Sequence, residues 1–183
     1  MIICAGNNET FKFAEPMGVG LIESAINLTR KCLFDKPEFL LFIGSAGSYG
    51  EHEIFDIVES NTAANLELSF LENNSYTPLD NVLQSDNKLV QNQTIVNSSN
   101  YITTNFELGQ KYNAHNVGIE NMEFYALVQV AKEFNINIGG IFVVTNYTNE
   151  NAHEDFIKNH VEAKSKLTRY LIDKNIIRTP KNS

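Results

Sequence analysis

The sequence predicts an α/β fold: a three-layer α/β/α sandwich around a mixed central sheet, formed by a single domain over residues 1–183. Apolar runs of strand length alternate with segments of helical periodicity, which is the pattern of a sheet covered by helices. Two of these runs are apolar throughout, as is typical of central strands. The length of 183 residues, 43% of them hydrophobic, suffices for one core, and no Gly/Ser/Pro-rich linker divides the chain.

The first elements are a strand over residues 1–5, a turn at Asn7-Asn8 and a helix over residues 19–33. Spacings of three and four place five residues on one face of that helix, which we expect to be buried. Pro37 prevents the helix from continuing. The residues of this face are Ile22, Ala25, Ile26, Thr29 and Leu33.

Residues 39–43 form the first entirely apolar run and predict a central strand. The glycine-rich stretch 44–50 follows and predicts a sharp turn at the carboxyl end of the strand, where α/β sheets bind ligands. Residues 54–58 alternate as a strand does. The polar stretch 60–93 predicts loops with one or two edge strands, and residues 94–97 a short strand.

Residues 122–134 are apolar almost all round and predict a deeply buried helix, in which Glu123 is the exception. Residues 138–145 form the second central strand, which ends in a polar cluster beginning at Thr145-Asn146. A last helix covers residues 152–173. Because carboxyl ends of inner strands meet at one edge of a sheet, this cluster and the glycine-rich stretch are expected to face a common crevice.

Charge and composition exclude several functions. With 14 Lys and Arg against 22 Asp and Glu, the chain has a net charge of −8 and no basic run, so neither nucleic acid nor an anionic membrane is an expected partner. We find no signal peptide or apolar run of spanning length, and Cys4 and Cys32 look like buried thiols. These features predict a soluble cytoplasmic protein. His153 and His160 lack the further ligands of a metal site, so no metal and no cofactor are expected.

Four stretches resemble motifs of the nucleoside phosphorylase and methylthioadenosine/S-adenosylhomocysteine nucleosidase superfamily, in the same order and spacing from about residue 16 to 173. The resemblance implies the fold of that superfamily, shortened here at the N-terminus, and cleavage of the N-glycosidic bond of a nucleoside. The four stretches are PMGVGLIESA (16–25), KPEFLLFIGSAG (36–47), ENME (120–123) and FVVTN (142–146).

The same resemblance implies roles for particular residues. The family's Met-Glu motif falls on Met122-Glu123, where the acid accepts hydrogen bonds from the ribose hydroxyls while positive charge builds on the sugar. Glu9 falls where the nucleosidases carry the Glu that activates water. The remaining substrate-binding residues that it implies are Gly44, Ser45, Ala46 and Gly47 against sugar and base, Tyr101 and Ile102 beside the base, and Thr145 next to Asn146.

Two departures from the family matter for the chemistry. Purine-cleaving members carry an Asp that protonates the base where this chain has Asn146, whose amide has no proton to give at neutral pH. Phosphorylases clamp phosphate with arginines, whereas the chain has only Arg30, Arg169 and Arg178, and Phe42-Ile43 precedes Gly44. Phosphate is thus a possible co-substrate only, and hydrolysis or binding is better supported than phosphorolysis.

The sequence favours an enzyme that cleaves a purine nucleoside through an oxocarbenium-like transition state. The enzyme would be a phosphorylase or a nucleosidase and would act in purine salvage. The alternatives are a degenerate nucleoside-binding protein, a uridine phosphorylase-like activity, and a structural subunit of an active homologue. Members of this family usually form oligomers, so the resemblance implies a homo-oligomer. Glu123 itself has a simpler interpretation as a surface acid at a helix start, and Asn146 as a mere turn residue.

Overall fold

The structure is a computed structural model and describes residues 1–178. Within these residues a mixed sheet of nine strands has the order β2-β1-β3-β8-β7-β5-β6, and β9 pairs with both β3 and β4. The strands are β1 (Ile2–Cys4), β2 (Glu15–Pro16), β3 (Phe39–Ser48), β4 (Ile57–Ser60), β5 (Thr62–Ala64), β6 (Val82–Gln84), β7 (Ile95–Ser98), β8 (Val117–Asn121) and β9 (Asn137–Tyr147).

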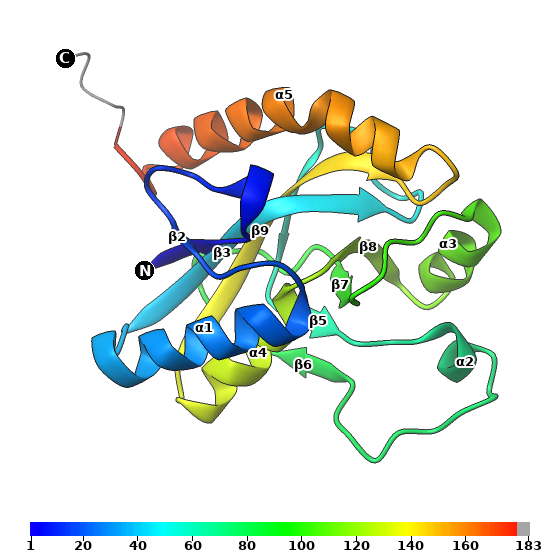
Figure 1. Cartoon of the computed structure of the whole chain (residues 1–183), viewed down its shortest axis with the longest axis horizontal. Coiled ribbons are helices and arrows are strands. Elements are labelled where there is room, and N and C mark those ends of the chain that lie inside the picture. Colours follow the sequence, from blue (N-terminus) through cyan, green and yellow to red (C-terminus); the bar gives the residue numbers. More distant parts are fainter. Residues whose placement is uncertain (179–183) are drawn as a thin grey trace.

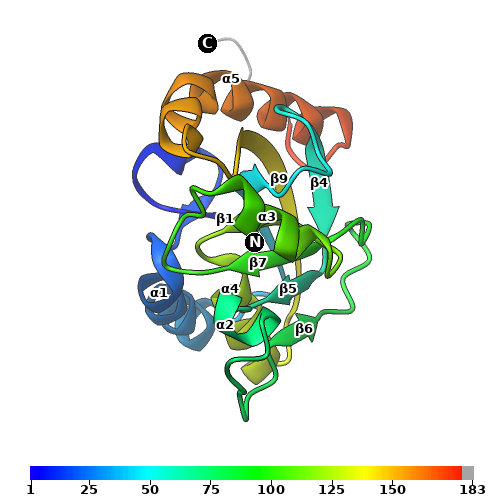
Figure 2. The same cartoon turned by 90° about the vertical axis from the view of Figure 1, so that its right-hand side faces the viewer.

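Helices cover both faces of this sheet, which confirms the expected three-layer α/β architecture (Figures 1 and 2). The long α5 lies over β9 and β3 on one face, while α4 and α1 pack together on the other. The helices are α1 (Gly20–Asp35), α2 (Leu68–Leu71), α3 (Phe106–Asn113), α4 (Phe124–Glu133) and α5 (Ala152–Asp173), with one 3-10 turn at Asn7–Glu9.

The two central strands are β3 and β9, which pair in parallel over most of their length. Their alternate side chains enter two cores. Phe42, Phe142 and Phe124 meet on the α4 side, where the rings of Phe124 and Phe142 cross edge to face at 5.2 Å. Leu41 and Ile43 face α5. Burial on both faces explains why these strands read as continuous apolar runs.

The predicted glycine turn is wrong over residues 44–48. Strand β3 continues through Ser48, because its backbone stays paired with β9 and, at Gly47 and Ser48, also with β8. The register shifts between Ala46 and Gly47, which is the signature of a β-bulge. The chain turns only afterwards, at Gly50, which has a φ of 118°.

The predicted buried face of α1 is also wrong. Gly20, Ser24, Leu28 and Cys32 are buried, whereas the side chains expected there are mostly outside. Small residues bring α1 close to α4, and the Ser24 hydroxyl can be buried because it donates to the Gly20 carbonyl at 2.7 Å. The exposed apolar side chains of α1 are Ile22 (70% exposed), Ile26, Leu33 and Phe34.

The two cysteines, Cys4 and Cys32, are free and buried, as expected. Among residues 1–178 we find no helix that combines the length and the apolar character that a bilayer crossing requires. The same residues contain no group of three or more His, Cys, Asp or Glu side chains arranged to hold a metal ion.

Candidate active site

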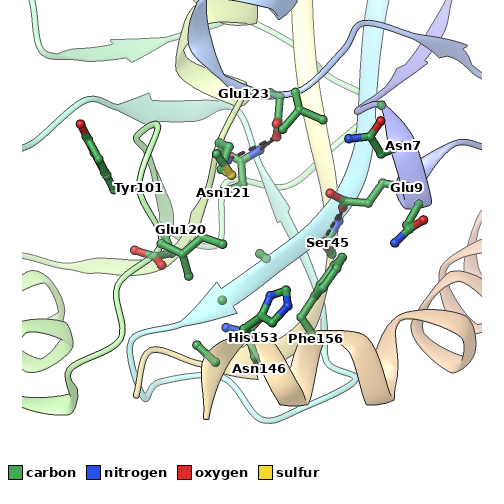
Figure 3. Close-up of a pocket in the computed structure, with 18 residues that line it drawn as sticks. Asn7, Glu9, Ser45, Tyr101, Glu120, Asn121, Glu123, Asn146, His153 and Phe156 are labelled. Carbon is green, nitrogen blue, oxygen red and sulfur yellow. Dashed lines mark hydrogen bonds between the residues drawn. The ribbon is translucent and has the colours of Figure 1, made fainter. Parts of the chain in front are cut away.

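A cavity of about 250 Å³ opens where the carboxyl ends of β3 and β9 meet the end of β8 (Figure 3). Segments from seven parts of the chain surround it, so the site depends on the tertiary fold. Its lining comprises Gly6, Asn7, Asn8 and Glu9; Val19; Ser45, Ala46 and Gly47; Tyr101 and Ile102; Glu120, Asn121, Met122 and Glu123; Asn146; and Ala152, His153 and Phe156.

Glu123 occupies the N-cap position of α4 but is only 3% exposed, so the interpretation as a surface acid at a helix start is wrong. One carboxylate oxygen accepts a hydrogen bond from the Gly20 N–H at 2.9 Å, and the other from the Met122 N–H at 3.2 Å. Burial, with the nearby charge of Glu9, raises the pKa of Glu123 to about 8. This acid is therefore poised to change its charge near neutral pH.

Glu9 lies on the 3-10 turn after β1 and points into the same cavity. Its carboxylate accepts hydrogen bonds from the Ser45 N–H at 2.9 Å and from the Ser45 hydroxyl. Burial raises the pKa of Glu9, and these hydrogen bonds and the Lys164 ammonium oppose that rise. Lys164 also donates to the carbonyls of Asn8 and Thr10, at 3.0 and 2.7 Å, and so fixes the turn to α5.

Asn146 lies in β9 near its carboxyl end, lines the cavity and is 6% exposed. Its Oδ1 accepts from the Thr145 hydroxyl at 2.9 Å, and its Nδ2 donates to the Tyr147 carbonyl at 3.2 Å. Gly47 makes room for this side chain, because a Cβ at Gly47 would lie 3.0 Å from Asn146 Nδ2. One N–H of the amide remains free of these contacts for a ligand.

Aromatic and apolar side chains flank the cavity on two sides. Tyr101 and Ile102, 83% and 49% exposed, lie on one side, and Figure 3 shows Tyr101 across the cavity from Glu9. Phe156 and His153, from the first turns of α5, lie beside Asn146. The site therefore combines carboxylates with apolar and aromatic side chains, an arrangement suited to a ligand that carries hydroxyl groups and a flat ring.

The structure brings together most of the residues that the sequence singles out: Glu9, Ser45, Ala46, Gly47, Tyr101, Ile102, Met122, Glu123 and Asn146. Gly44 and Thr145 do not line the cavity. Gly44 lies next to the Phe42 ring, and Thr145 is buried behind Asn146, where its hydroxyl orients the amide. Sequence reasoning missed the other cavity residues, which are Gly6, Asn7, Asn8, Val19, Glu120, Asn121, Ala152, His153 and Phe156.

No lysine or arginine among residues 1–178 lines this cavity. Three of its side chains are acids, Glu9, Glu120 and Glu123, and burial raises the pKa of each. An anion such as phosphate would therefore meet carboxylates without a guanidinium or ammonium partner from residues 1–178.

The comparisons with known proteins agree with this fold. The family model described as "Phosphorylase superfamily" matches residues 104–174, which include β8, α4, β9 and α5. No curated protein matches the sequence significantly. The resemblance to the nucleoside phosphorylase superfamily is confirmed at this level.

Solved structures resemble the whole fold. The methylthioadenosine/S-adenosylhomocysteine nucleosidase of Streptococcus pneumoniae, in complex with 8-aminoadenine, superposes with a TM-score of 0.78 at 16% identity, over 95% of this chain and 97% of that one. Futalosine hydrolase of Helicobacter pylori gives a TM-score of 0.80 at 13% identity, over 95% of both chains. An aspartate-to-asparagine mutant of the Helicobacter pylori nucleosidase, with 5′-methylthioadenosine in its active site, gives 0.79 at 13% identity, over 95% and 96%.

Proposed function

We propose that this chain, which has the fold of the nucleoside phosphorylase superfamily, hydrolyses the N-glycosidic bond of a purine nucleoside. The observation that carries the proposal is the pair of carboxylates, half-buried Glu9 and buried Glu123, that face one cavity between apolar walls. The solved relatives support it, since their names are those of nucleosidases and a hydrolase, and two of them hold adenine-type ligands.

In this proposal Glu123 accepts hydrogen bonds from the ribose hydroxyls. Its negative charge favours the oxocarbenium-like transition state over the ground state, because positive charge develops on the sugar only as the bond breaks. The carboxylate has to be ionised for this role. With its pKa near 8, hydroxyl donors and the cationic sugar would pull the acid into its charged form.

Glu9 takes the role of general base. It accepts a proton from a water molecule that adds to the anomeric carbon, while the electron pair of the C–N bond passes to the departing base. A carboxylate with a raised pKa is a better proton acceptor near neutral pH than an ordinary one. Ser45, which donates twice to Glu9, orients it.

Asn146 donates a hydrogen bond to the base, and Tyr101 and Ile102 flank it. An amide polarises the leaving group without protonating it, so we expect slow turnover. Water is the proposed nucleophile in preference to phosphate, because the described cavity residues include no lysine or arginine to pair with an anion.

The direct test is to incubate the purified protein with inosine, adenosine, methylthioadenosine and uridine, with and without phosphate, and to follow base release. We expect release from a purine nucleoside at a rate that phosphate leaves unchanged. Release that requires phosphate would overturn hydrolysis, and release from uridine alone would overturn the assignment to purines.

Asn146 favours one second candidate, a nucleoside-binding protein without turnover. The Asp-to-Asn mutant of the Helicobacter pylori nucleosidase with methylthioadenosine in its active site is consistent with such a state. This candidate predicts that nucleosides raise the melting temperature while no base is released in any mixture, a result that would replace the enzyme proposal.

We also propose that the protein forms a homo-oligomer through the exposed apolar side of α1. Ile22 and Leu33 are 70% and 56% exposed, and apolar side chains of this size are usually covered in an assembly when they cluster. We expect light scattering to give a mass of two or more chains at micromolar concentration, and Ile22→Lys with Leu33→Lys to reduce it to one. A wild-type monomer under these conditions would contradict the proposal.

A further inference from the structure

The segment over residues 99–104 connects β7 to α3 and holds Tyr101 and Ile102 beside the cavity. Two contacts fix it. At one end, Asn100 Oδ1 accepts a hydrogen bond from the Leu21 N–H at 2.9 Å, at the start of α1. At the other end, Thr103 donates its N–H at 2.8 Å and its hydroxyl at 2.6 Å to the two carboxylate oxygens of Glu120. Tyr101 and Ile102 lie between the two anchors.

Glu120 is itself rigidly held. It lies on β8, is 7% exposed, and its Oε2 also accepts the Tyr49 hydroxyl at 2.7 Å. Tyr49 is 1% exposed and stacks on Tyr112 with ring centroids 4.7 Å apart and planes at 11°. The carboxylate is thus attached to the core on one side and to Thr103 on the other.

Burying this carboxylate is costly, because no lysine or arginine among residues 1–178 pairs with it in a salt bridge. Burial raises the pKa of Glu120, and the hydrogen bonds from Thr103 and Tyr49 oppose the rise. Its three donors occupy both oxygens, so the side chain acts on its neighbours and not on the reacting atoms. Glu120 is also three residues before Glu123, so one short stretch carries the acid for the sugar and the anchor of the Tyr101 segment.

We propose that Glu120 is a positioning residue for the base: through Thr103 it fixes the segment that places Tyr101 and Ile102 against the flat end of the ligand. The proposal rests on the proposed function, since it presumes that a nucleobase occupies this side of the cavity. It predicts that loss of the Glu120–Thr103 contact weakens binding of a free base and leaves binding of a free sugar unchanged.

The test compares Glu120→Gln with Glu59→Gln as a matched control. Glu59 is 2% exposed and, like Glu120, accepts a tyrosine hydroxyl and a backbone N–H, from Tyr170 at 2.8 Å and Gln91 at 2.7 Å, but it does not line the cavity. Dissociation constants for adenine and for D-ribose are measured by ligand-detected NMR. Hydrogen exchange of residues 99–104 is measured in the free proteins.

We expect Glu120→Gln to weaken adenine binding about tenfold, which is typical for loss of a charge-assisted hydrogen bond, and to speed exchange over residues 99–104. Ribose binding should stay within twofold, and Glu59→Gln should change none of the three. Thr103→Val, which keeps the backbone N–H but removes the hydroxyl, should have a smaller effect in the same direction, and it serves as the test if Glu120→Gln does not fold.

An adenine constant that stays unchanged in both variants would overturn the role of Glu120, as would equal weakening of adenine and ribose, which indicates a general structural effect. A wild-type protein that binds neither adenine nor ribose would overturn the proposed function as well. The two failures are distinguishable, because only the second abolishes binding before any substitution is made.

Discussion

Replacing Asn146 with aspartate is expected to raise the rate of purine release by about 10²–10⁴-fold, the usual contribution of a general acid. The surroundings of residue 146 would favour the protonated form of an aspartate at this position. Asn146 Nδ2 lies 3.2 Å from the Tyr147 carbonyl, so an aspartate in the same position would bring an oxygen against that carbonyl. The repulsion, together with the acids Glu9 and Glu123 in the same cavity, favours the neutral form of the new carboxyl, and the neutral form can give a proton to the base.

The matched control is Asn159→Asp. Asn159 is 9% exposed and lies on α5, where its Nδ2 donates to the Thr145 carbonyl at 2.8 Å, but it does not line the cavity. This variant introduces the same chemical change next to Thr145, the residue that precedes Asn146, but outside the cavity. We therefore expect no gain in rate. Base release is measured from adenosine, inosine and methylthioadenosine. An Asn146→Asp variant that folds, binds the nucleoside and gains nothing would favour the binding protein over a weakened enzyme.

The sequence predicts best those elements whose own residues decide their structure. Helix α4 and strand β9 are apolar almost throughout, so burial on all sides is their only stable environment, and both were predicted close to their observed bounds. Helix α5 was predicted over the observed range, since Ala163, Leu167 and Leu171 share one side. Strand β8, with the short sequence VGIEN, and helix α3 carry no comparable pattern and were missed.

Errors arose where a neighbour in space decides the structure. Gly44 and Gly47 lie in a continuous strand, because β9 and β8 pair with it on both sides, and no local signal distinguishes such glycines from those of a turn. On α1 the residue spacing is compatible with two faces, and the small residues Gly20 and Ser24 are buried because α4 approaches closely.

More of the candidate site than of the fold could be predicted, because the resemblance identified residues that the local sequence pattern could not connect. Glu9 and Glu123 are 114 positions apart, yet both face the cavity. What the resemblance could not supply is the contribution of α5: His153 and Phe156 enter the cavity only because the helix starts beside the end of β9. The environment of Glu120 also depends on the fold, since its partners Tyr49 and Thr103 come from distant segments.

Replacing Glu123 with glutamine is expected to have opposite effects on activity and on stability. The amide keeps an oxygen for the Gly20 N–H but removes the negative charge that the cationic sugar needs. We expect kcat/KM to fall by about 10²–10³-fold, the loss seen when one electrostatic group of a transition-state site is removed. In the wild type, nucleoside binding should tighten as the pH rises through about 8, where Glu123 ionises, and the variant should lose this dependence.

Stability should change in the other direction. Because the pKa of Glu123 is raised from its ordinary value of 4.5 to about 8, the folded protein retains a proton that the unfolded chain has released. The free energy of unfolding of the wild type therefore decreases as the pH rises from 4.5 to 8. This group contributes up to roughly 1.4 kcal/mol of that decrease per pH unit. Glutamine does not titrate, so we expect Glu123→Gln to melt above the wild type at pH 8 and to lose that advantage towards pH 4.5.

Glu59→Gln provides a control of opposite sign. Burial opposes ionisation of Glu59, but the Gln91 N–H, the Lys174 ammonium and the Tyr170 hydroxyl outweigh it and lower the pKa of Glu59. Its ionised form thus stabilises the folded protein above the unfolded pKa, and Glu59→Gln should melt below the wild type at pH 8 while base release is unchanged. Melting curves for the three proteins from pH 4.5 to 9 decide the matter. Glu123→Gln also removes one acceptor of the backbone N–H groups of Gly20 and Met122 at every pH. A difference in melting temperature between this variant and the wild type that does not move in favour of the variant from pH 4.5 to 8 would therefore contradict the raised pKa of Glu123.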